Sequence, residues 1–175
     1  MEPWLVVVDM QRVFGDPTSG WYAEGYDEIT PVIERLTDRF SGRTVYTRFV
    51  RDPVETGAWR TYYDEWPQFR LAPDDPQWDL TVTVPTDAPV VDEPTFSKWT
   101  PALQAIVGNA PLVVCGVATE CCVLSTVLGA ANAGSAVTVV RDACVGGSSE
   151  LHAEALTVME SFAPLVRVRA SVEID

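Results

Sequence analysis

Residues 112–140 have the sequence LVVCGVATECCVLSTVLGAANAGSAVTVV. The apolar, β-branched runs at 112–117 and 137–140 predict two strands that are buried on both faces. Between them, the small residues at 122–133 predict a helix, and Gly134 is a typical residue to end it. A strand, a helix and a second apolar strand in this order are typical of a parallel pair joined by a crossover helix.

The rest of the chain repeats this alternation. After residue 140 the pattern predicts a helix over 149–162 and a strand over 165–168. In the first half, apolar runs and helical spacings predict strands at 4–8, 44–49 and 90–91, and helices at 27–40 and 101–107. Such alternation indicates an α/β fold with three layers, a parallel sheet between two layers of helices. With no internal repeat and no linker, we expect one domain over residues 1–175.

Residues 50–87 interrupt this pattern. The stretch is broken by prolines and crowded with aromatic residues, namely Trp59, Tyr62, Tyr63, Trp66, Phe69 and Trp78. Long irregular segments in a compact domain are commonly functional lids or binding loops. Because aromatic side chains line ligand pockets, we expect a variable binding loop here. The same rings could instead cap the core or an oligomer interface.

Composition excludes some functions. The chain has 12 basic and 25 acidic residues, a formal charge of −13, so binding to nucleic acid or to an anionic membrane is not expected. No apolar run reaches the length of a membrane span, and the N-terminus does not resemble a signal peptide. The cysteines lack CxxC spacing, which argues against a zinc site or a disulfide scaffold. These features predict a cytoplasmic protein with reduced thiols.

Reactive residues follow three of the predicted strands. Asp9 comes directly after the first strand, Lys98 follows the third, and Cys121 and Cys122 open the helix after the fourth. In parallel sheets, ligands bind beyond the carboxyl ends of the strands, so we expect these side chains to meet. A helix N-terminus and a nearby ammonium favour a thiolate, and a carboxylate can accept the thiol proton. Lys98 is the only lysine, beside eleven arginines.

Each of these residues also has a structural interpretation. A carboxylate after a strand is often a turn residue, and a cysteine in a small-residue helix is often a packed thiol. We interpret Cys115 and Cys144 as core thiols, and His152, the only histidine, as structural. Only the occurrence of three reactive groups at three strand ends favours a site.

The segment from Gly116 to Val123, GVATECCV, resembles the G-V-A-T-x-x-C-V signature of the isochorismatase-like cysteine hydrolases. Asp9, Gln11 and Phe14 resemble the opening D-x-Q-x-x-F motif of that family, and Asp142-Ala143-Cys144 its usual ending. The resemblance covers the whole chain except the loop at 50–87. It implies a six-stranded parallel sheet in a Rossmann-like order and assembly as a homodimer or homotetramer.

The resemblance also assigns roles to residues. It makes Asp9, Lys98 and Cys122 a catalytic triad, with Cys122 rather than Cys121 as the nucleophile. It further implies a cis peptide bond between Val117 and Ala118, and an oxyanion hole formed by the amides of Ala118 and Cys122. The thiolate would attack an amide carbonyl and form a thioester, which water then hydrolyses.

Two departures from the family are visible. The lysine of the family commonly stands where this chain has Glu93, so we expect Lys98 to reach the site from a shifted position. Zinc-binding members use an aspartate and histidines after the second strand. Residues 50–87 contain no histidine, so we expect neither metal nor other cofactor.

We therefore expect a metal-independent amidohydrolase that cleaves the C–N bond of a small carboxamide. The predicted substrate-binding residues are Phe14, Trp59, Tyr62, Tyr63 and Trp66. One alternative is an isochorismatase-type vinyl-ether hydrolase, because some relatives cleave such bonds without a cysteine. Another is a non-catalytic interaction subunit with the same fold, an alternative that Glu93 in the usual lysine position favours.

Overall fold

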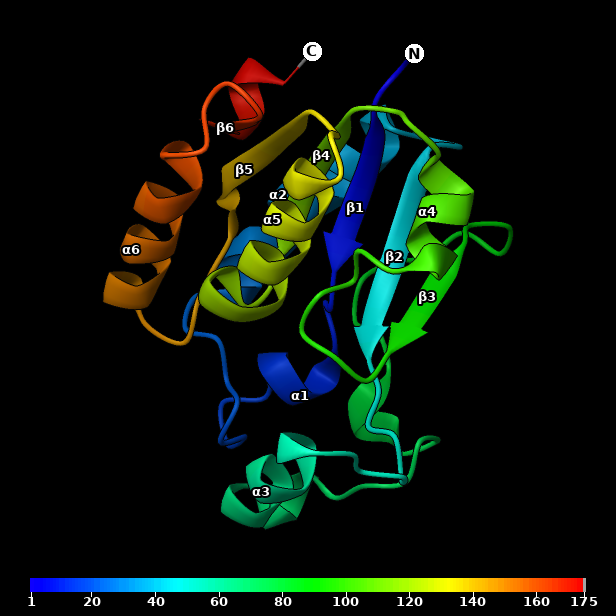
Figure 1. Ribbon diagram of the computed structural model, residues 1–175, viewed down its shortest axis with the longest axis vertical. Helices are drawn as coiled ribbons and strands as arrows, with labels where there is room; N and C mark the ends of the chain where they lie inside the picture. The colour runs from blue at the N-terminus through cyan, green and yellow to red at the C-terminus, as the bar shows by residue number, and fades with distance from the viewer. Residues whose placement is uncertain (175) are drawn as a thin grey trace.

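Six parallel strands form one sheet in the computed structural model, which describes residues 1–174 (Figure 1). The strand order is β3-β2-β1-β4-β5-β6. The bounds are β1 Trp4–Val8, β2 Thr44–Phe49, β3 Val90–Glu93, β4 Leu112–Gly116, β5 Val137–Cys144 and β6 Val166–Arg169. The predicted α/β class and six-stranded parallel sheet are confirmed. The strand order reverses between β1 and β4, the point where such sheets bind ligands.

Helices cover both faces of the sheet. In Figure 1, α5 and α6 lie in front of the sheet and α2 lies behind it. The helix bounds are α1 Arg12–Gly15, α2 Tyr26–Arg39, α3 Ala58–Glu65, α4 Pro101–Val107, α5 Leu124–Asn132 and α6 Ser149–Glu160. Short helical turns occur at η1 Pro67–Phe69, η2 Pro76–Trp78, η3 Thr119–Val123 and η4 Ser171–Glu173. Within residues 1–174, no helix has the length and apolar character needed to cross a membrane.

The segment at 50–87 is more regular than predicted. It contains the two-turn helix α3 and the turns η1 and η2, and Leu80 forms an antiparallel bridge with Gln11. Two of the prolines that suggested irregular chain, Pro67 and Pro76, stand at the starts of η1 and η2, where their missing N–H groups cost nothing. In Figure 1, α3 lies below the carboxyl ends of the strands. The segment is therefore placed to cover that end of the sheet.

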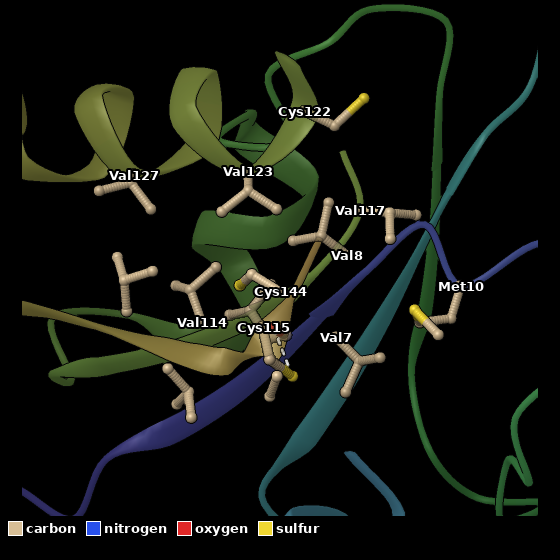
Figure 2. Close-up of a cluster of buried hydrophobic side chains, with 14 of the residues drawn as sticks. Val7, Val8, Met10, Val114, Cys115, Val117, Cys122, Val123, Val127 and Cys144 are labelled. Carbon is tan, nitrogen blue, oxygen red and sulfur yellow. Dashed lines mark hydrogen bonds between the residues drawn. The ribbon is translucent and has the colours of Figure 1, made fainter. Parts of the chain in front are cut away.

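The core is formed by the central strands and α5. Val7, Val114 and Val127 are fully buried and belong to the cluster in Figure 2. The sulfur atoms of Cys115 and Cys144 lie inside this cluster, as predicted for packed thiols. The apolar stretches that identified the strands in the sequence are thus the residues that exclude water from the sheet.

Gly116 allows β4 to end against β1. Its φ angle is +116°, and a Cβ atom there would lie 2.0 Å from the carbonyl oxygen of Val8. Only glycine fits this close approach without displacing the backbone. The next residue, Val117, donates its N–H to the same Val8 carbonyl at 3.0 Å. The chain segments that follow β1 and β4 therefore start side by side.

Candidate active site

Asp9 turns the chain sharply at the end of β1. Its φ angle is +49°, a left-handed conformation that aspartate adopts more readily than most residues. The side chain is fully buried, and its Oδ1 accepts a hydrogen bond from the hydroxyl of Thr47 on β2 at 2.6 Å. The backbone N–H of Asp9 donates to the same hydroxyl at 3.3 Å. Thr47 thus fixes the carboxylate from the neighbouring strand.

Lys98 forms a buried ion pair with Asp9. The two side chains are fully buried, and Lys98 Nζ lies 3.1 Å from Asp9 Oδ2. The ammonium also donates to the carbonyl oxygen of Thr95 at 2.8 Å and lies 4.9 Å from the ring centroid of Phe49. The backbone N–H of Lys98 donates to Thr126 on α5 at 2.8 Å. Lys98 therefore reaches Asp9 from its shifted position in the sequence.

Glu93, which stands in the usual lysine position, has a structural contact instead. It is the last residue of β3, and its Oε1 accepts a hydrogen bond from the hydroxyl of Thr100 at 2.6 Å. Thr100 is the residue before α4. Glu93 therefore fixes the loop that carries Lys98.

Cys122 lies in the turn η3 rather than in α5. The carbonyl of Ala118 accepts hydrogen bonds from the amides of Cys121 at 3.0 Å and Val123 at 3.2 Å. No hydrogen bond joins that carbonyl to the amide of Cys122, which lies between them in the described chain. Such π-turns often occur at functional sites. In Figure 2 the sulfur of Cys122 points away from the valine cluster.

The protonation state of Cys122 differs from the sequence expectation. Burial raises the pKa of the Cys122 thiol well above its usual range, and the negative charge of Asp9 raises it further. Lys98 lowers this pKa, but burial dominates. This direction opposes the resting thiolate that the sequence predicted. The prediction weighed the helix terminus and the ammonium but not the loss of water around a side chain that is 3% exposed.

The chain before Cys122 contains a cis peptide bond between Val117 and Ala118, as the resemblance implied. Thr119 donates its N–H to Val145 at 3.0 Å, and its hydroxyl is hydrogen-bonded to His152 Nδ1 at 2.8 Å. His152 therefore holds the start of the π-turn. This contact agrees with its interpretation as a structural residue.

A cavity of about 450 Å³ opens onto Cys122. Its aromatic lining residues come from four separate segments and are Phe14, Trp21, Tyr22, Phe49, Tyr62, Trp66 and Phe96. The lining is completed by Ala118, Cys121, Cys122, Gly20, Glu120, Gly147 and Leu151. A polar hollow of about 530 Å³ near Glu34 and Pro89 has no cysteine, lysine or histidine among its lining residues. The apolar cavity is therefore the one associated with reactive groups.

The predicted wall residues separate into two groups. Phe14, Tyr62 and Trp66 line the cavity. Trp59 lies behind the wall, with its ring centroid 5.3 Å from that of Tyr62. Tyr63 is 2% exposed and carries the Arg51 guanidinium over its ring at 5.5 Å. The structure therefore does not place Trp59 or Tyr63 on the cavity wall, because successive residues of α3 face different directions.

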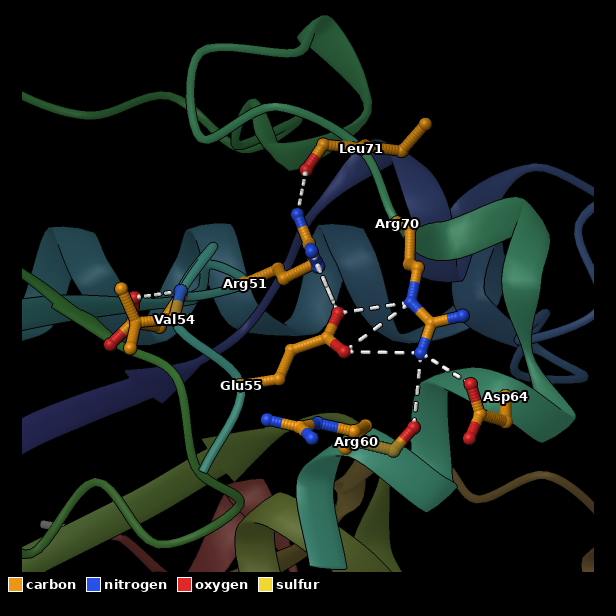
Figure 3. A network of polar contacts seen from close by, with 8 residues as sticks. Arg51, Val54, Glu55, Arg60, Asp64, Arg70 and Leu71 are labelled. Atoms are coloured by element: carbon orange, nitrogen blue, oxygen red, sulfur yellow. Dashed lines mark hydrogen bonds and ion pairs between the residues drawn. The ribbon is translucent and has the colours of Figure 1, made fainter. Parts of the chain in front are cut away.

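Ion pairs attach α3 to the segments beside it. Glu55 lies between two guanidinium groups, with contacts of 2.7 Å to Arg51 and 3.1 Å to Arg70 (Figure 3). Arg70 also pairs with Asp64 of α3 at 2.6 Å, and Arg51 donates to the carbonyl of Leu71 at 3.2 Å. Hydrogen bonding to Arg70 lowers the pKa of the Glu55 carboxyl group. This network, which we call the Glu55 network, holds the helix that carries Tyr62.

Sequence reasoning missed several residues of the site. Thr47 and Phe49 lie at the carboxyl end of β2, and the strand-end rule that identified Asp9 would have found them too. Trp21 and Phe96 lie in irregular segments, where no periodic pattern marked them. Trp21 stacks on Phe69, with ring centroids 3.8 Å apart. It therefore joins the 50–87 segment to the loop after β1.

A buried cysteine, a carboxylate and an ammonium thus lie near the switch point of a parallel sheet, where such sheets bind ligands. Family comparison shows which hydrolases the chain belongs to. The model of the isochorismatase domain matches residues 3–170, and the chain belongs to the isochorismatase family of hydrolases. Comparison of the sequence with curated proteins gives no match.

Solved structures have the same fold. A cysteine hydrolase from Pseudomonas syringae pv. phaseolicola 1448A superposes with a TM-score of 0.84 and 23% identity, covering 98% of this chain and 90% of that one. N-carbamoylsarcosine amidase from Thermoplasma acidophilum superposes with a TM-score of 0.79 and 19% identity, covering 100% and 99%. Pyrazinamidase of Pyrococcus horikoshii, in complex with zinc, gives a TM-score of 0.78 and 27% identity, covering 97% and 99%.

That pyrazinamidase is in complex with zinc, and the donor set of this chain differs from a metal site. Within residues 1–174, no three His, Cys, Asp or Glu side chains are grouped so that they could hold a metal ion. His152 lies on α6, and its Nδ1 is occupied by the hydroxyl of Thr119. The described residues therefore do not fit a zinc site.

Proposed function

We propose that this protein is a metal-independent amidohydrolase that uses Cys122 as its nucleophile. The observation that supports the proposal is the meeting of three groups, Asp9, Lys98 and Cys122. Asp9 Oδ2 lies 3.1 Å from Lys98 Nζ, and the charges of both groups act on the pKa of the Cys122 thiol. Apart from its ion pair with Lys98, this carboxylate oxygen has no hydrogen-bond partner among the described residues. It is therefore available to accept a proton.

Acylation begins with transfer of the thiol proton to Asp9. The sulfur of Cys122 forms a bond to the carbonyl carbon of the amide as the C=O π electrons move to oxygen. The amides of Ala118 and Cys122 would donate to this oxyanion. The tetrahedral intermediate then collapses, the C–N bond breaks, and Asp9 returns its proton to the leaving nitrogen. Ammonia or an amine leaves, and the acyl group remains as a thioester.

Deacylation uses the same groups with water as the nucleophile. Asp9 accepts a proton from water as its oxygen attacks the thioester carbonyl, and the thiol leaves with that proton. Lys98 remains a cation throughout. It orients the carboxylate, and it lowers the cost of negative charge on the sulfur in the transition state. Lysine suits this role because its compact ammonium fits between Asp9, Thr95 and the ring of Phe49.

Product analysis tests the proposal. The wild-type protein, pretreated with EDTA, is incubated with a panel of primary amides, and the released ammonia and carboxylic acid are measured. We expect the two products in equal amounts. Mass spectrometry of a quenched reaction should find the acyl group on Cys122. The Cys122→Ala variant should lose turnover by at least about 10⁴-fold, whereas the Cys121→Ala variant should retain it, because among the described residues the polar partners of Asp9 and Lys98 do not include Cys121.

Other results would contradict the proposal in distinct ways. Pyruvate release from isochorismate, with activity retained by the Cys122→Ala variant, would assign the vinyl-ether reaction. Loss of amidase activity in EDTA, restored by zinc, would overturn metal independence. Failure of Cys122 to form any acyl adduct across the amide panel would favour a non-catalytic interaction subunit.

A further inference from the structure

The cavity over Cys122 is lined mainly by aromatic rings and has negative but no positive charge in its lining. Of its fourteen lining residues, seven are aromatic, and Glu120 alone is charged. No arginine, lysine or histidine belongs to the lining. The wall is thus rich in ring faces and lacks a group that could neutralise an anion.

Basic residues close to the cavity already form ion pairs with carboxylates of the protein. Lys98 is fully buried and is not a lining residue, and its ammonium is bound by Asp9 and by the carbonyl of Thr95. Arg51 and Arg70, on the segment that carries the wall, both pair with Glu55. A ligand carboxylate in the cavity would therefore find no free cation along its lining.

Glu120 adds negative charge to the same space. One of its carboxylate oxygens accepts the N–H of Gly147 at 2.8 Å. The other oxygen is buried and has no hydrogen-bond partner among the described residues. Within the same residues, no lysine, arginine or histidine lies close enough to Glu120 to form an ion pair. The formal charge of −13 on the chain acts in the same direction.

We infer that the cavity selects amides whose acyl group is aromatic and carries no negative charge. This inference rests on the proposed function and names the class of substrate for it. Ring faces such as those of Trp66 and Tyr62 stabilise a flat acyl group by stacking. A carboxylate on the same group would lose its water without gaining a counter-charge, and it would be repelled by Glu120. The site therefore discriminates by charge as well as by shape.

Two pairs of probes test this inference in the wild-type protein. The first pair is 4-acetylbenzamide and 4-carboxybenzamide, which are similar in size and differ in charge. We expect kcat/KM to be at least about tenfold lower for the carboxylate, because an unpaired charge is costly to desolvate. The second pair is benzamide and cyclohexanecarboxamide, for which we expect a preference for the planar ring. Equal values for the first pair would overturn the charge selection, and equal values for the second would overturn the aromatic selection.

Variants at the rim and at Glu120 link the selection to the residues named here. Leu151 lines the cavity and is 44% exposed, so a long polar side chain is tolerated there. Leu151→Lys should raise the ratio of kcat/KM for 4-carboxybenzamide over 4-acetylbenzamide about tenfold, whereas the matched uncharged variant Leu151→Gln should leave this ratio unchanged. Glu120→Gln, which keeps an acceptor for Gly147, should also raise the ratio. Unchanged ratios in both charge variants would contradict the inference.

A binding measurement separates this inference from the proposed function. Quenching of tryptophan fluorescence in the Cys122→Ala variant reports binding without turnover, because Trp21 and Trp66 line the cavity. Tighter binding of 4-acetylbenzamide than of 4-carboxybenzamide would support the charge selection even if the wild-type protein hydrolysed no amide. Hydrolysis of amides with equal binding of both probes would support the function and overturn the selection.

Discussion

The floor and the wall of the cavity are built by different physical means. What we call the floor is the group of Asp9, Lys98 and Cys122, which are almost completely buried and come from the end of β1, the loop between β3 and α4, and the turn before α5. The wall comes from four segments, and the one that carries Tyr62 and Trp66 is attached by the Glu55 network. Groups in the floor have no water to replace a lost partner, whereas Arg70 and Asp64 of the Glu55 network are 32% and 59% exposed. We therefore expect changes in the floor to affect chemistry and stability together, and changes in the wall to affect binding.

Removing the ammonium from the floor should have the largest effect. In Lys98→Met, the Asp9 carboxylate would remain buried without its cation, which lowers the free energy of unfolding by about 3–5 kcal/mol. We expect kcat to fall about 10³-fold, since the thiol loses the charge that favours its ionisation. Urea unfolding and amide hydrolysis measure the two effects.

Two further variants sharpen this test. Lys98→Arg keeps the charge but places a planar group against Thr95 and Phe49, so we expect a large loss of rate with a smaller loss of stability. The double variant Asp9→Asn/Lys98→Met should recover much of the stability and none of the activity. Near-normal kinetics for Lys98→Arg would mean that the reaction does not require a lysine at this position.

The pH dependence of thiol alkylation tests the protonation state of the floor. Burial raises the pKa of the Cys122 thiol, so its thiolate fraction is small at neutral pH and grows as the pH rises. Alkylation of Cys122 by iodoacetamide, followed by peptide mass spectrometry, should accelerate about tenfold for each pH unit from 6 to 9. A plateau below pH 8 would mean that the thiolate is the resting form.

Loosening the wall should have the smallest effect. Glu55→Gln removes the carboxylate that joins Arg51 to Arg70, and α3 loses part of its attachment. We expect KM for 4-acetylbenzamide to rise about threefold with kcat nearly unchanged, because the reacting groups do not touch this network. Arg141→Gln, which breaks the exposed pair with Glu173, is the control and should change neither constant. If kcat of Glu55→Gln fell as much as that of Lys98→Met, the expected difference between floor and wall would be wrong.

The sequence was sufficient to predict the floor but not the wall. Asp9 and Cys122 follow buried strands, and the ends of adjacent parallel strands must meet, so their positions could be inferred without a structure. The lone lysine was predicted for the same reason, and it lies in contact with Asp9. These inferences succeeded because strands are identified by long apolar runs.

The wall could not be predicted in the same way. The crowding of aromatic residues at 50–87 indicated a pocket, but it did not indicate which rings face it. Tyr62 and Tyr63 are neighbours in α3, yet Tyr62 lines the cavity and Tyr63 is buried beneath Arg51. Trp21 contacts Phe69 across nearly fifty residues of sequence, and no local pattern encodes such a contact. The error about the thiolate has a similar origin, because burial depends on the whole fold.

Because Gly116 carries a hydrogen atom in place of a side chain, the two chain segments that lead to Asp9 and to Cys122 can lie close together. Any methyl group at this position would push apart the backbones that lead to Asp9 and to Cys122, because Val8 stands directly against it. Proton transfer over a hydrogen bond tolerates little stretching. In the proposed mechanism, the distance between the base and its nucleophile therefore depends on a residue that takes no part in the reaction, and a substitution at Gly116 should abolish activity although every reactive group remains in the chain.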